Sequence, residues 1–579
     1  MHKKVSLLFL FILLKGGVIW GQVTPVTEQP VLNDRYVQII KADIFRRVKR
    51  DSAGDLNILK GNVIMQQQNT LIYCDSAVQN VLLNQVETFG NIHINDNDSV
   101  HAYSQYMQYM GDTKVATLKK RVKLTDGKGV LTTEALEYNV GTNIGTYLNN
   151  GKVVNGESVL TSKEGIYYAN TRDVFFQKKV KLVDPEYTMT TDTLRYNLNT
   201  EIANFLAPTI IKDERSTIKT RRGMYDLKKG KAIFTDRPEI RDSTQLVYAD
   251  SIAYDKITGA GRAIGNVEYR DSAQGIAMFA GATDFNNDSK TVTSYYNPLL
   301  VLKQKNDSLF VTADTLHSAY LQSDSTKPKN PADTIRYFTA FHHVRLFSDS
   351  LQSKCDSLYY SGIDSVFRFF AEPVIWTQGS QISGDTIFLA TKNRKAEKIN
   401  VNENAFTINR TADGMFNQMK GNELTGQFIE GSIDFLRVKG NGENLYYLQD
   451  EDSAYVGVNY TMADAIVMRF ANKELKRVTW FNSVTGTTYP IMQLPEDKKE
   501  LRNFKWLENI RPKSVTDIWA DWNKIQKPIE DSVQLTDEEK KPLKSLNSPQ
   551  KSSDKVPLKS SGDKPKKNNP VKTPIRKES

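Results

Sequence analysis

Cysteine, long apolar runs and a basic surface are the three things this sequence has little of. Its 579 residues include only two cysteines, Cys74 and Cys355. Beyond the N-terminus no apolar run approaches the about 20 residues of a membrane-spanning helix. The formal charge of +10 is concentrated at one end, because residues 540–579 hold 12 Lys/Arg against 3 Asp/Glu. Nucleic-acid binding needs basic side chains clustered on a folded surface, so we expect no nucleic-acid partner.

The sequence also lacks recognisable motifs for nucleotide binding, metal binding or catalysis. The run Gly259–Gly265 has the wrong spacing for a dinucleotide-binding loop, and no helical pattern follows it. His342 and His343 are adjacent, so they cannot face the same side of a strand and bind a metal together. No nucleophile stands near a candidate base in any recognisable motif. We therefore expect no enzyme, no cofactor and no metal site.

The N-terminus has the features of an export signal. A basic start, His2-Lys3-Lys4, precedes a ten-residue run from Val5 to Leu14 that is apolar except for Ser6, and small residues follow before Gln22. An apolar run of ten residues is too short to span a bilayer but suits a cleaved signal peptide. Residues 1–21 are therefore predicted to be a signal peptide and 22–37 an N-terminal arm. An uncleaved anchor is the alternative.

A five-residue phrase recurs through most of the chain: an acidic or polar residue, a small or polar one, an aliphatic, a spacer and an aromatic. We count thirteen copies between Asp75 and Glu443, at steps of 28 to 33 residues apart from one step of 42. A second phrase, Gly-Asn-Val or a variant with proline, lies between successive copies. A fixed period of this length indicates a stacked repeat protein.

The two phrases together predict a strand with a corner in it. Within the first phrase the aliphatic and the aromatic are two residues apart, which places them on one face of a strand. Gly-Asn suits a bulge at which the strand changes direction. Residues 38–489 are thus predicted to be all-β: an elongated jellyroll of two facing antiparallel sheets, with about 30 residues per layer. Thirteen layers at about 4.8 Å would give a stack about 60 Å long.

The two ends of this array have different compositions. Residues 490–525 are irregular and aromatic, and we interpret them as a cap over the last open layer, with a docking surface as the alternative. Residues 526–579 lack aromatics and are rich in Lys, Pro and Ser, which predicts a disordered tail. Cys74 and Cys355 lie nine copies apart, too far for a disulfide, so both are expected to be free, packed thiols.

The repeated phrases resemble the OstA-like family of periplasmic lipopolysaccharide-transport bridge proteins. Gly61-Asn62-Val63, Gly90-Asn91-Ile92 and Gly265-Asn266-Val267 match one element of that family, while the strands that begin at Asp192, Asp250 and Asp356 match the other. The resemblance covers residues 38–450. It implies a taco-shaped fold that shields acyl chains of lipopolysaccharide, or of a related glycolipid, on the way to the outer membrane. The chain departs from the family in having more copies than a single bridge subunit and no following barrel.

The resemblance also implies where the lipid binds and what the partners are. The expected partners are other lipopolysaccharide-transport components at the ends of the stack, with head-to-tail self-association and a periplasmic location. The inward residues of the two phrases form the expected lipid-binding groove: Val63, Ile92, Leu136, Tyr138, Ile166, Tyr168, Val180, Leu194, Tyr196, Ile252, Tyr254, Val267, Leu358 and Tyr360.

Two other readings of the repeat remain open. A structural β-solenoid, such as an adhesin or surface scaffold, would have a closed core and no lipid. A carbohydrate-processing β-helix enzyme would need a cluster of carboxylates in a cleft. The recurring acid of the phrase is present in most layers, and this favours a structural role at a strand end over a catalytic one.

Overall fold

The computed structural model describes residues 37–50, 54–96, 98, 100–127, 129–303, 307–321, 335–392, 395–412, 414–429, 432–450, 452, 454–471 and 474–521. The chain divides into two compact units, Met1–Pro528 and Ile529–Ser579. All of the described residues belong to the first unit. The predicted signal peptide (1–21), residues 22–36 of the predicted arm and the predicted tail (526–579) lie outside the described residues.

Within the described residues the fold consists of forty strands, three short 3-10 helices and one helical turn. The first fourteen strands are β1 (Gln38–Lys41), β2 (Ile44–Val48), β3 (Leu56–Gln67), β4 (Thr70–Asn80), β5 (Gln85–Asp96), β6 (Val100–Met110), β7 (Val115–Thr125), β8 (Val130–Asn139), β9 (Ile144–Tyr147), β10 (Gly151–Asn155), β11 (Ser158–Ser162), β12 (Glu164–Tyr168), β13 (Asp173–Val183) and β14 (Thr188–Asn197). The next fourteen are β15 (Ile202–Phe205), β16 (Thr209–Lys212), β17 (Ser216–Thr220), β18 (Arg222–Asp226), β19 (Lys231–Thr235), β20 (Glu239–Asp242), β21 (Gln245–Tyr248), β22 (Ser251–Asp255), β23 (Ala260–Asp271), β24 (Ile276–Asn286), β25 (Thr291–Tyr295), β26 (Leu299–Leu302), β27 (Leu309–Thr312) and β28 (Thr315–Leu321). The last twelve are β29 (Ile335–Phe347), β30 (Gln352–Ser361), β31 (Val366–Phe370), β32 (Val374–Thr377), β33 (Ser380–Ser383), β34 (Thr386–Lys392), β35 (Lys395–Ala412), β36 (Met415–Ile429), β37 (Ser432–Gln449), β38 (Tyr455–Ala471), β39 (Glu474–Phe481) and β40 (Thr485–Tyr489). The helical elements are η2 (Ile491–Gln493), η3 (Glu496–Lys498), η4 (Glu508–Ile510) and α1 (Val515–Ile518).

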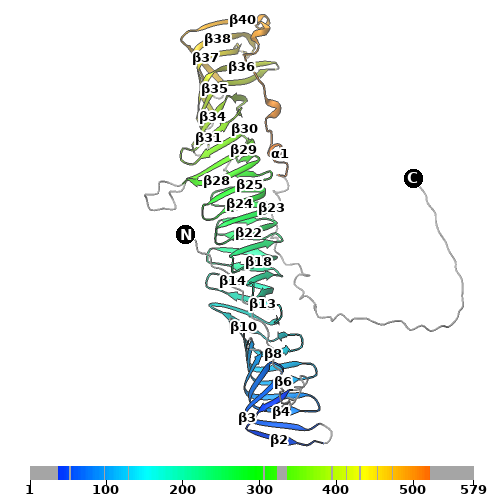
Figure 1. Ribbon diagram of the computed structural model, residues 1–579. Coiled ribbons are helices and arrows are strands. Elements are labelled where there is room, and N and C mark those ends of the chain that lie inside the picture. The colour runs from blue at the N-terminus through cyan, green and yellow to red at the C-terminus, as the bar shows by residue number, and fades with distance from the viewer. Residues whose placement is uncertain are drawn as a thin grey trace, which may run out of the picture. The chain divides into compact units, whose positions relative to one another are not determined.

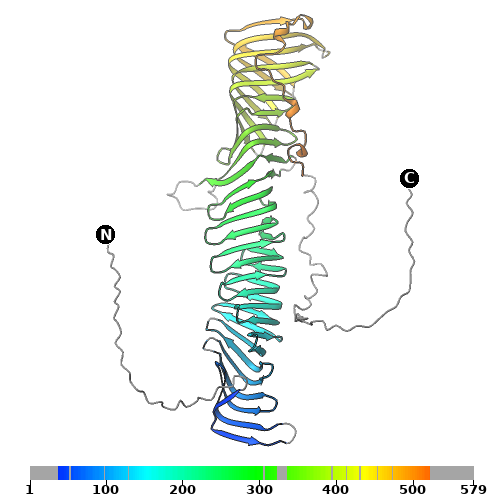
Figure 2. The same cartoon turned by 45° about the vertical axis from the view of Figure 1, so that its right-hand side comes forward.

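The strands follow one another along the array in sequence order, each paired antiparallel with its neighbours (Figure 1, Figure 2). This confirms the predicted all-β repeat fold. The two facing walls are parts of one continuous antiparallel sheet, folded along a line that we call the crease. We call the wall that carries the acid-aliphatic-aromatic phrase the first arm, and the wall that follows the bulge the second arm.

Each copy of the phrase contributes two strands to each arm rather than one. Between Asp75 and Ser104, for example, the first arm receives the ends of β4 and β5, and the second arm receives the ends of β5 and β6. Strands in a sheet are about 4.8 Å apart, so a copy advances the array by about 10 Å. The stack of about 60 Å expected from one layer per copy is therefore too short, and thirteen copies extend on the order of 120 Å.

The crease is built by bulges with two consecutive residues in the left-handed conformation. Gly61 has a φ of 76° and Asn62 a φ of 46°, and the register of β3 against β4 shifts between Lys60 and Val63. Glycine and asparagine tolerate this conformation better than other residues. The Asn62 side-chain amide donates to Asp43 Oδ2 at 2.8 Å, so the Asp before the strand fastens the bulge of the next copy.

The same bond repeats along the crease. Asn91 donates to Asp75 Oδ2 at 2.9 Å, Asn266 to Asp250 Oδ2 at 2.8 Å and Asn404 to Asp385 at 3.0 Å. His342 and His343 occupy such a bulge and contact two different acids, Asp356 at 3.2 Å and Asp314 at 2.9 Å. The recurring acid therefore has the structural role at a strand end that its frequency predicted.

Residues 490–521, which we call the strap, do not form a cap over the last layer as the sequence suggested. They run back along the outer face of the second arm. Gln418 donates to Lys499 O at 2.8 Å, Gln381 donates to Lys505 O at 2.7 Å, and Arg511 donates to Gln352 Oε1 at 2.7 Å. Trp519 Nε1 reaches Asn297 O at 2.9 Å. The strap therefore links several layers, because the buried Gln418, Gln381 and Gln352, which lie in successive layers, each hydrogen-bond to it.

The strap explains why both faces of the second arm are buried in this region. Phe310, Phe347 and Val301 pack against Ile518 and Trp519, while Ile408 and Leu445 pack against Leu494 and Leu501. Cys74 and Cys355 are free and each 5% exposed. This confirms the expectation of packed thiols.

Candidate functional site

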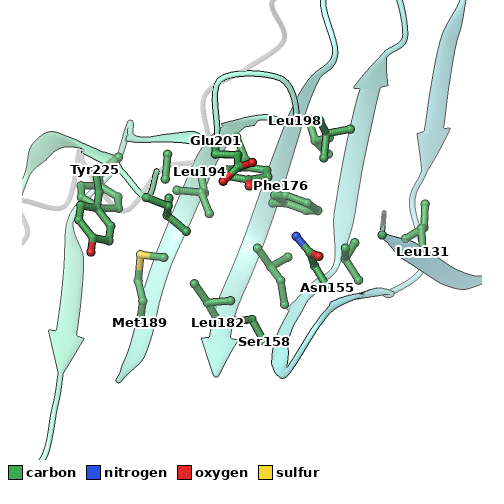
Figure 3. Close-up of a pocket in the computed structure, with 18 of the residues that line it drawn as sticks. Leu131, Asn155, Ser158, Phe176, Leu182, Met189, Leu194, Leu198, Glu201 and Tyr225 are labelled. Atoms are coloured by element: carbon green, nitrogen blue, oxygen red, sulfur yellow. The ribbon is translucent and has the colours of Figure 1, made fainter. Parts of the chain in front are cut away.

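An apolar cavity of about 840 Å³ lies between the arms, and its lining residues run from Val100 to Lys256. Its floor is the crease, and its walls are the inward faces of both arms. Figure 3 shows Phe176, Leu182, Met189 and Leu194, from β13 and β14, projecting into this space. Both strands cross the crease, so each supplies one lining segment to each wall.

The pairing of strands explains why the second-arm wall is continuous. Leu182 pairs with Met189, Met189 with Ile211, and Ile211 with Ile218. Residues that pair across an antiparallel ladder point to the same face. One inward residue per strand is enough to make an unbroken apolar row, and Leu124, Leu131, Val153 and Leu160 extend it.

The first-arm wall combines small residues with tyrosines. Gly145, Ala203 and Ala232 line the cavity and leave volume where larger side chains would fill it. Burial raises the pKa of Tyr147 to about 12. Burial likewise raises the pKa of Tyr187, on the opposite wall, to about 12, with the Asp184 carboxylate adding to the rise. These hydroxyls stay neutral at physiological pH, so the walls carry no tyrosinate charge there.

Turns at the outer ends of the two arms form two rims that face each other across the mouth of the cavity. Arg172, on a first-arm turn, lies 3.6 Å from Asp126 on a second-arm turn, and it also donates to Tyr167 at 3.3 Å. Lys256, on another first-arm turn, pairs with Glu186 of the second arm. Asp126, Glu186, Tyr167 and Lys256 all line the cavity. The mouth is thus crossed by two ion pairs.

Six of the fourteen residues predicted for the groove line cavities. Leu136, Ile166, Leu194, Tyr196 and Tyr254 line the main cavity. Leu136 also lines a neighbouring cavity of about 50 Å³, together with Tyr138.

The other eight predicted residues lie elsewhere. Val63, Ile92, Val180 and Val267 are 1–3% exposed and fill the crease just after the bulges. Ile252 is fully buried in a separate core cluster. Leu358 belongs to the filled interior of the later layers, and Tyr360 packs on Phe367 with ring centroids 4.4 Å apart. Tyr168 packs against Phe175, with ring centroids 5.6 Å apart, while its neighbour Tyr167 lines the cavity.

The prediction missed most of the second-arm wall. Leu182, Met189, Ile211 and Ile218 line the cavity but were not selected. A sequence pattern that marks this wall was present. Two residues after each valine that follows a bulge there is another apolar residue, as Leu182 follows Val180. The first of the pair fills the crease, and the second reaches the cavity.

Other kinds of site are not seen in the described part of the chain. There, no group of three or more His, Cys, Asp or Glu could hold a metal ion. None of the described helices is long and apolar enough to cross a membrane.

The fold and the cavity define an elongated β-repeat protein that encloses an apolar space between two arms. The family model described as OstA-like protein matches residues 34–192, so this segment is an OstA-like domain. The match confirms the resemblance for this segment of the chain. No curated protein matches the chain.

Proposed function

We propose that this protein is a periplasmic lipid carrier that shields acyl chains of lipopolysaccharide, or of a related glycolipid, and helps deliver them to the outer membrane. The cavity between the arms is the observation that carries the proposal. Its volume lies within the about 300–1,000 Å³ typical of ligand sites, and its walls are aliphatic and aromatic. The OstA-like segment contributes its first layers.

The carrier acts by burial and not by chemistry on the lipid. Each CH₂ group moved from water to an apolar wall contributes about 0.8 kcal/mol. A chain lying along the row from Leu131 to Ile218 would gain this along its buried length without a fixed polar anchor in the walls. Such binding is additive along the chain and tolerates movement from one layer to the next, as transport requires.

Open sheet edges at both ends suit partners. β1 and β2 pair only with β3, and β39 and β40 only with β38, among the described strands. On β2, Ile44 and Phe45 are 60% and 56% exposed. Unpaired edges of this kind can add a strand from another chain. We propose that other transport components, or a second copy of this chain, dock there.

A structural scaffold is the second candidate, and the later layers favour it for their own part of the chain. From Val311 to Met468 the interior is a packed cluster in which many side chains are 0–2% exposed. The two functions divide the array, with the carrier segment lying between packed first layers and the packed later layers. We propose the same domain bounds as the sequence predicts: residues 1–21 are an export signal, 38–489 the repeat array and 526–579 a basic tail.

Photo-crosslinking tests the proposal at two matched tyrosines. Tyr196 and Tyr360 occupy the same place in the phrase, but only Tyr196 lines the cavity. Each is replaced by p-benzoylphenylalanine in the full-length protein in cells that make lipopolysaccharide, and adducts are detected by anti-lipopolysaccharide blotting after irradiation. We expect an adduct at Tyr196 and none at Tyr360. Absence of an adduct at Tyr196 would rule the carrier function out.

A further inference from the structure

The two rims of the cavity mouth carry opposite charge. Among the described residues, the first-arm turns 169–172, 198–201, 227–230 and 256–259 carry four bases and one acid: Arg172, Lys228, Lys229, Lys256 and Glu201. The second-arm turns 126–127, 156–157, 184–187 and 213–215 carry six acids and one base: Asp126, Glu157, Asp184, Glu186, Asp213, Glu214 and Arg215. Opposite charges on facing rims attract each other.

Two contacts join the rims, one toward each end of the cavity. Asp126 and Arg172 are 46 positions apart in sequence, and Glu186 and Lys256 are 70 positions apart, so each pair joins different layers as well as different arms. The side chain of Arg172 is 31% exposed and that of Asp126 is 15% exposed, against 54% for Lys256 and 67% for Glu186. Solvent reaches both cations, and both lie beside the apolar walls.

Exposed pairs of this kind are weak. They typically contribute about 0–1 kcal/mol each, because water screens them and both side chains lose freedom. An amphiphile with its chain between the walls would bring its own anionic group to the same cations. A phosphate binds such cations through charge-assisted hydrogen bonds.

We propose that the rims form an electrostatic seam, in which Arg172 and Lys256 exchange Asp126 and Glu186 for the anionic group of a bound amphiphile. The seam is closed when the cavity is empty and opens as the ligand provides the replacement charge. The ligand class is therefore an acyl amphiphile with a phosphate or carboxylate at its head, in preference to an uncharged one. This inference rests on the proposed carrier function and adds the headgroup chemistry and the route of entry to it.

Matched amphiphiles and opposed charge variants test the seam. The probes are dodecyl phosphate and uncharged dodecyl maltoside, both below their micelle-forming concentrations, and Kd is measured by calorimetry on the full-length protein. The Arg172→Gln/Lys256→Gln variant removes the cations, and the Asp126→Asn/Glu186→Gln variant removes their competitors. Both variants break the same two ion pairs, so a purely structural role would shift Kd in the same direction in both.

Opposite shifts are expected for the phosphate probe. Its affinity should fall about fivefold in the Arg172→Gln/Lys256→Gln variant and rise about fivefold in the Asp126→Asn/Glu186→Gln variant, with the maltoside Kd changed less than twofold by the loss of the cations. Arg262→Gln is the control, because Arg262 pairs with Asp284 on the outer face of the first arm and should leave both Kd values unchanged.

The outcomes separate this inference from the function on which it rests. The seam is overturned if the Kd of dodecyl phosphate shifts in the same direction in the two double variants, or if it shifts equally in Arg262→Gln. In that case a lipopolysaccharide adduct at Tyr196 still supports the carrier function. Failure of both probes to bind, together with no adduct at Tyr196, overturns both proposals.

Discussion

The layers around residues 124–256 and those around residues 297–468 share one repeated phrase but enclose different interiors. The first set surrounds a cavity of about 840 Å³, whereas the second encloses a packed core that includes Phe369, Ile387 and Met419. The strap lies on the second set and on the layer just before it, at Phe279. The comparison shows that the phrase determines the path of the backbone, while the sizes of the inward side chains determine whether the space between the arms is filled.

The outer face of the second arm differs between the two sets in the same way. In the open layers it carries polar residues such as Thr188, Lys212 and Thr217, and in the filled layers the same row of the ladder carries Phe310, Trp376 and Ile408. Apolar side chains on that face are stable only because the strap covers them. We therefore expect a layer that is packed on both faces to open less readily than a layer with solvent on one face and a cavity on the other.

Removing the strap's anchor should have the largest effect. Trp519 is 7% exposed and packs on Phe279, with ring centroids 5.9 Å apart. Trp519→Ala should lower the free energy of unfolding by about 3–5 kcal/mol. Tyr225→Ala in the open cavity wall is the matched aromatic change and should cost clearly less, because one side of Tyr225 faces empty space. Urea unfolding followed by both circular dichroism and tryptophan fluorescence measures this, since repeat arrays can depart from two-state behaviour.

An equal cost at the two positions would contradict the comparison. It would mean that the walls of the open layers are packed as tightly as the strapped face.

Breaking one glutamine of the strap should have the next largest effect. Gln381 is 1% exposed, donates to Lys505 O at 2.7 Å and accepts from Leu507 N at 2.8 Å. Gln381→Ala leaves two backbone groups without partners and should cost about 2–4 kcal/mol. Thr217→Ala, on the outer face of an open layer, should cost about 0.5 kcal/mol or less. Both values are read from urea unfolding, and a cost below 1 kcal/mol at Gln381 would show that the strap is loosely held.

Adding volume to the interior should separate the two sets of layers directly. Ala340 is fully buried in the filled core and Ala203 lines the cavity; both are on inward positions of the first arm. Ala340→Phe should destabilise by about 1–3 kcal/mol through overpacking, while Ala203→Phe should be close to neutral and should weaken binding of an acyl amphiphile. Thermal unfolding and calorimetric titration test the two parts. A stability loss at Ala203 as large as that at Ala340 would show that the cavity cannot take up added volume.

The sequence predicted the repeat, the corner and the role of the acid because each rests on local geometry. Gly61-Asn62 suits a bulge because both residues tolerate the left-handed conformation, and period two places Leu194 and Tyr196 on one face. The strap was not predicted, because the buried residues to which it hydrogen-bonds are distant in sequence, from 81 positions for Gln418 and Lys499 to 222 for Asn297 and Trp519. A signal for it existed nonetheless. Leu299-Leu300-Val301-Leu302 is a continuous apolar run, which is typical of a strand buried on both faces.

The division between cavity and core could not be read from the phrase either. Leu194 and Leu358 occupy the same position in the phrase, between an acid two residues before and a tyrosine two residues after, yet one lines a cavity and the other is packed in a core. Whether an inward leucine meets a partner depends on residues of the opposite arm and of adjacent layers. That information is distributed over several copies, and no single copy contains it.

Thiol labelling should show the smallest difference and reports on local opening. Cys74 lies in a layer without the strap. Cys355 lies in the filled core, three residues along β30 from Gln352, which the strap binds. Burial raises the pKa of each thiol to about 12 from an ordinary value of 9.0, so at pH 8 both are protonated in the closed state and react only when a layer opens. Because the folded state favours the protonated thiol, the contribution of each cysteine to the free energy of unfolding is complete below pH 9 and is lost as the pH rises toward 12.

At pH 8 we expect a maleimide to label Cys74 about tenfold faster than Cys355, which corresponds to about 1.4 kcal/mol in the free energy of opening. Cys355→Ser and Cys74→Ser assign the two rates by mass spectrometry, and faster labelling of Cys355 would show that the strap does not stiffen the layers on which it lies.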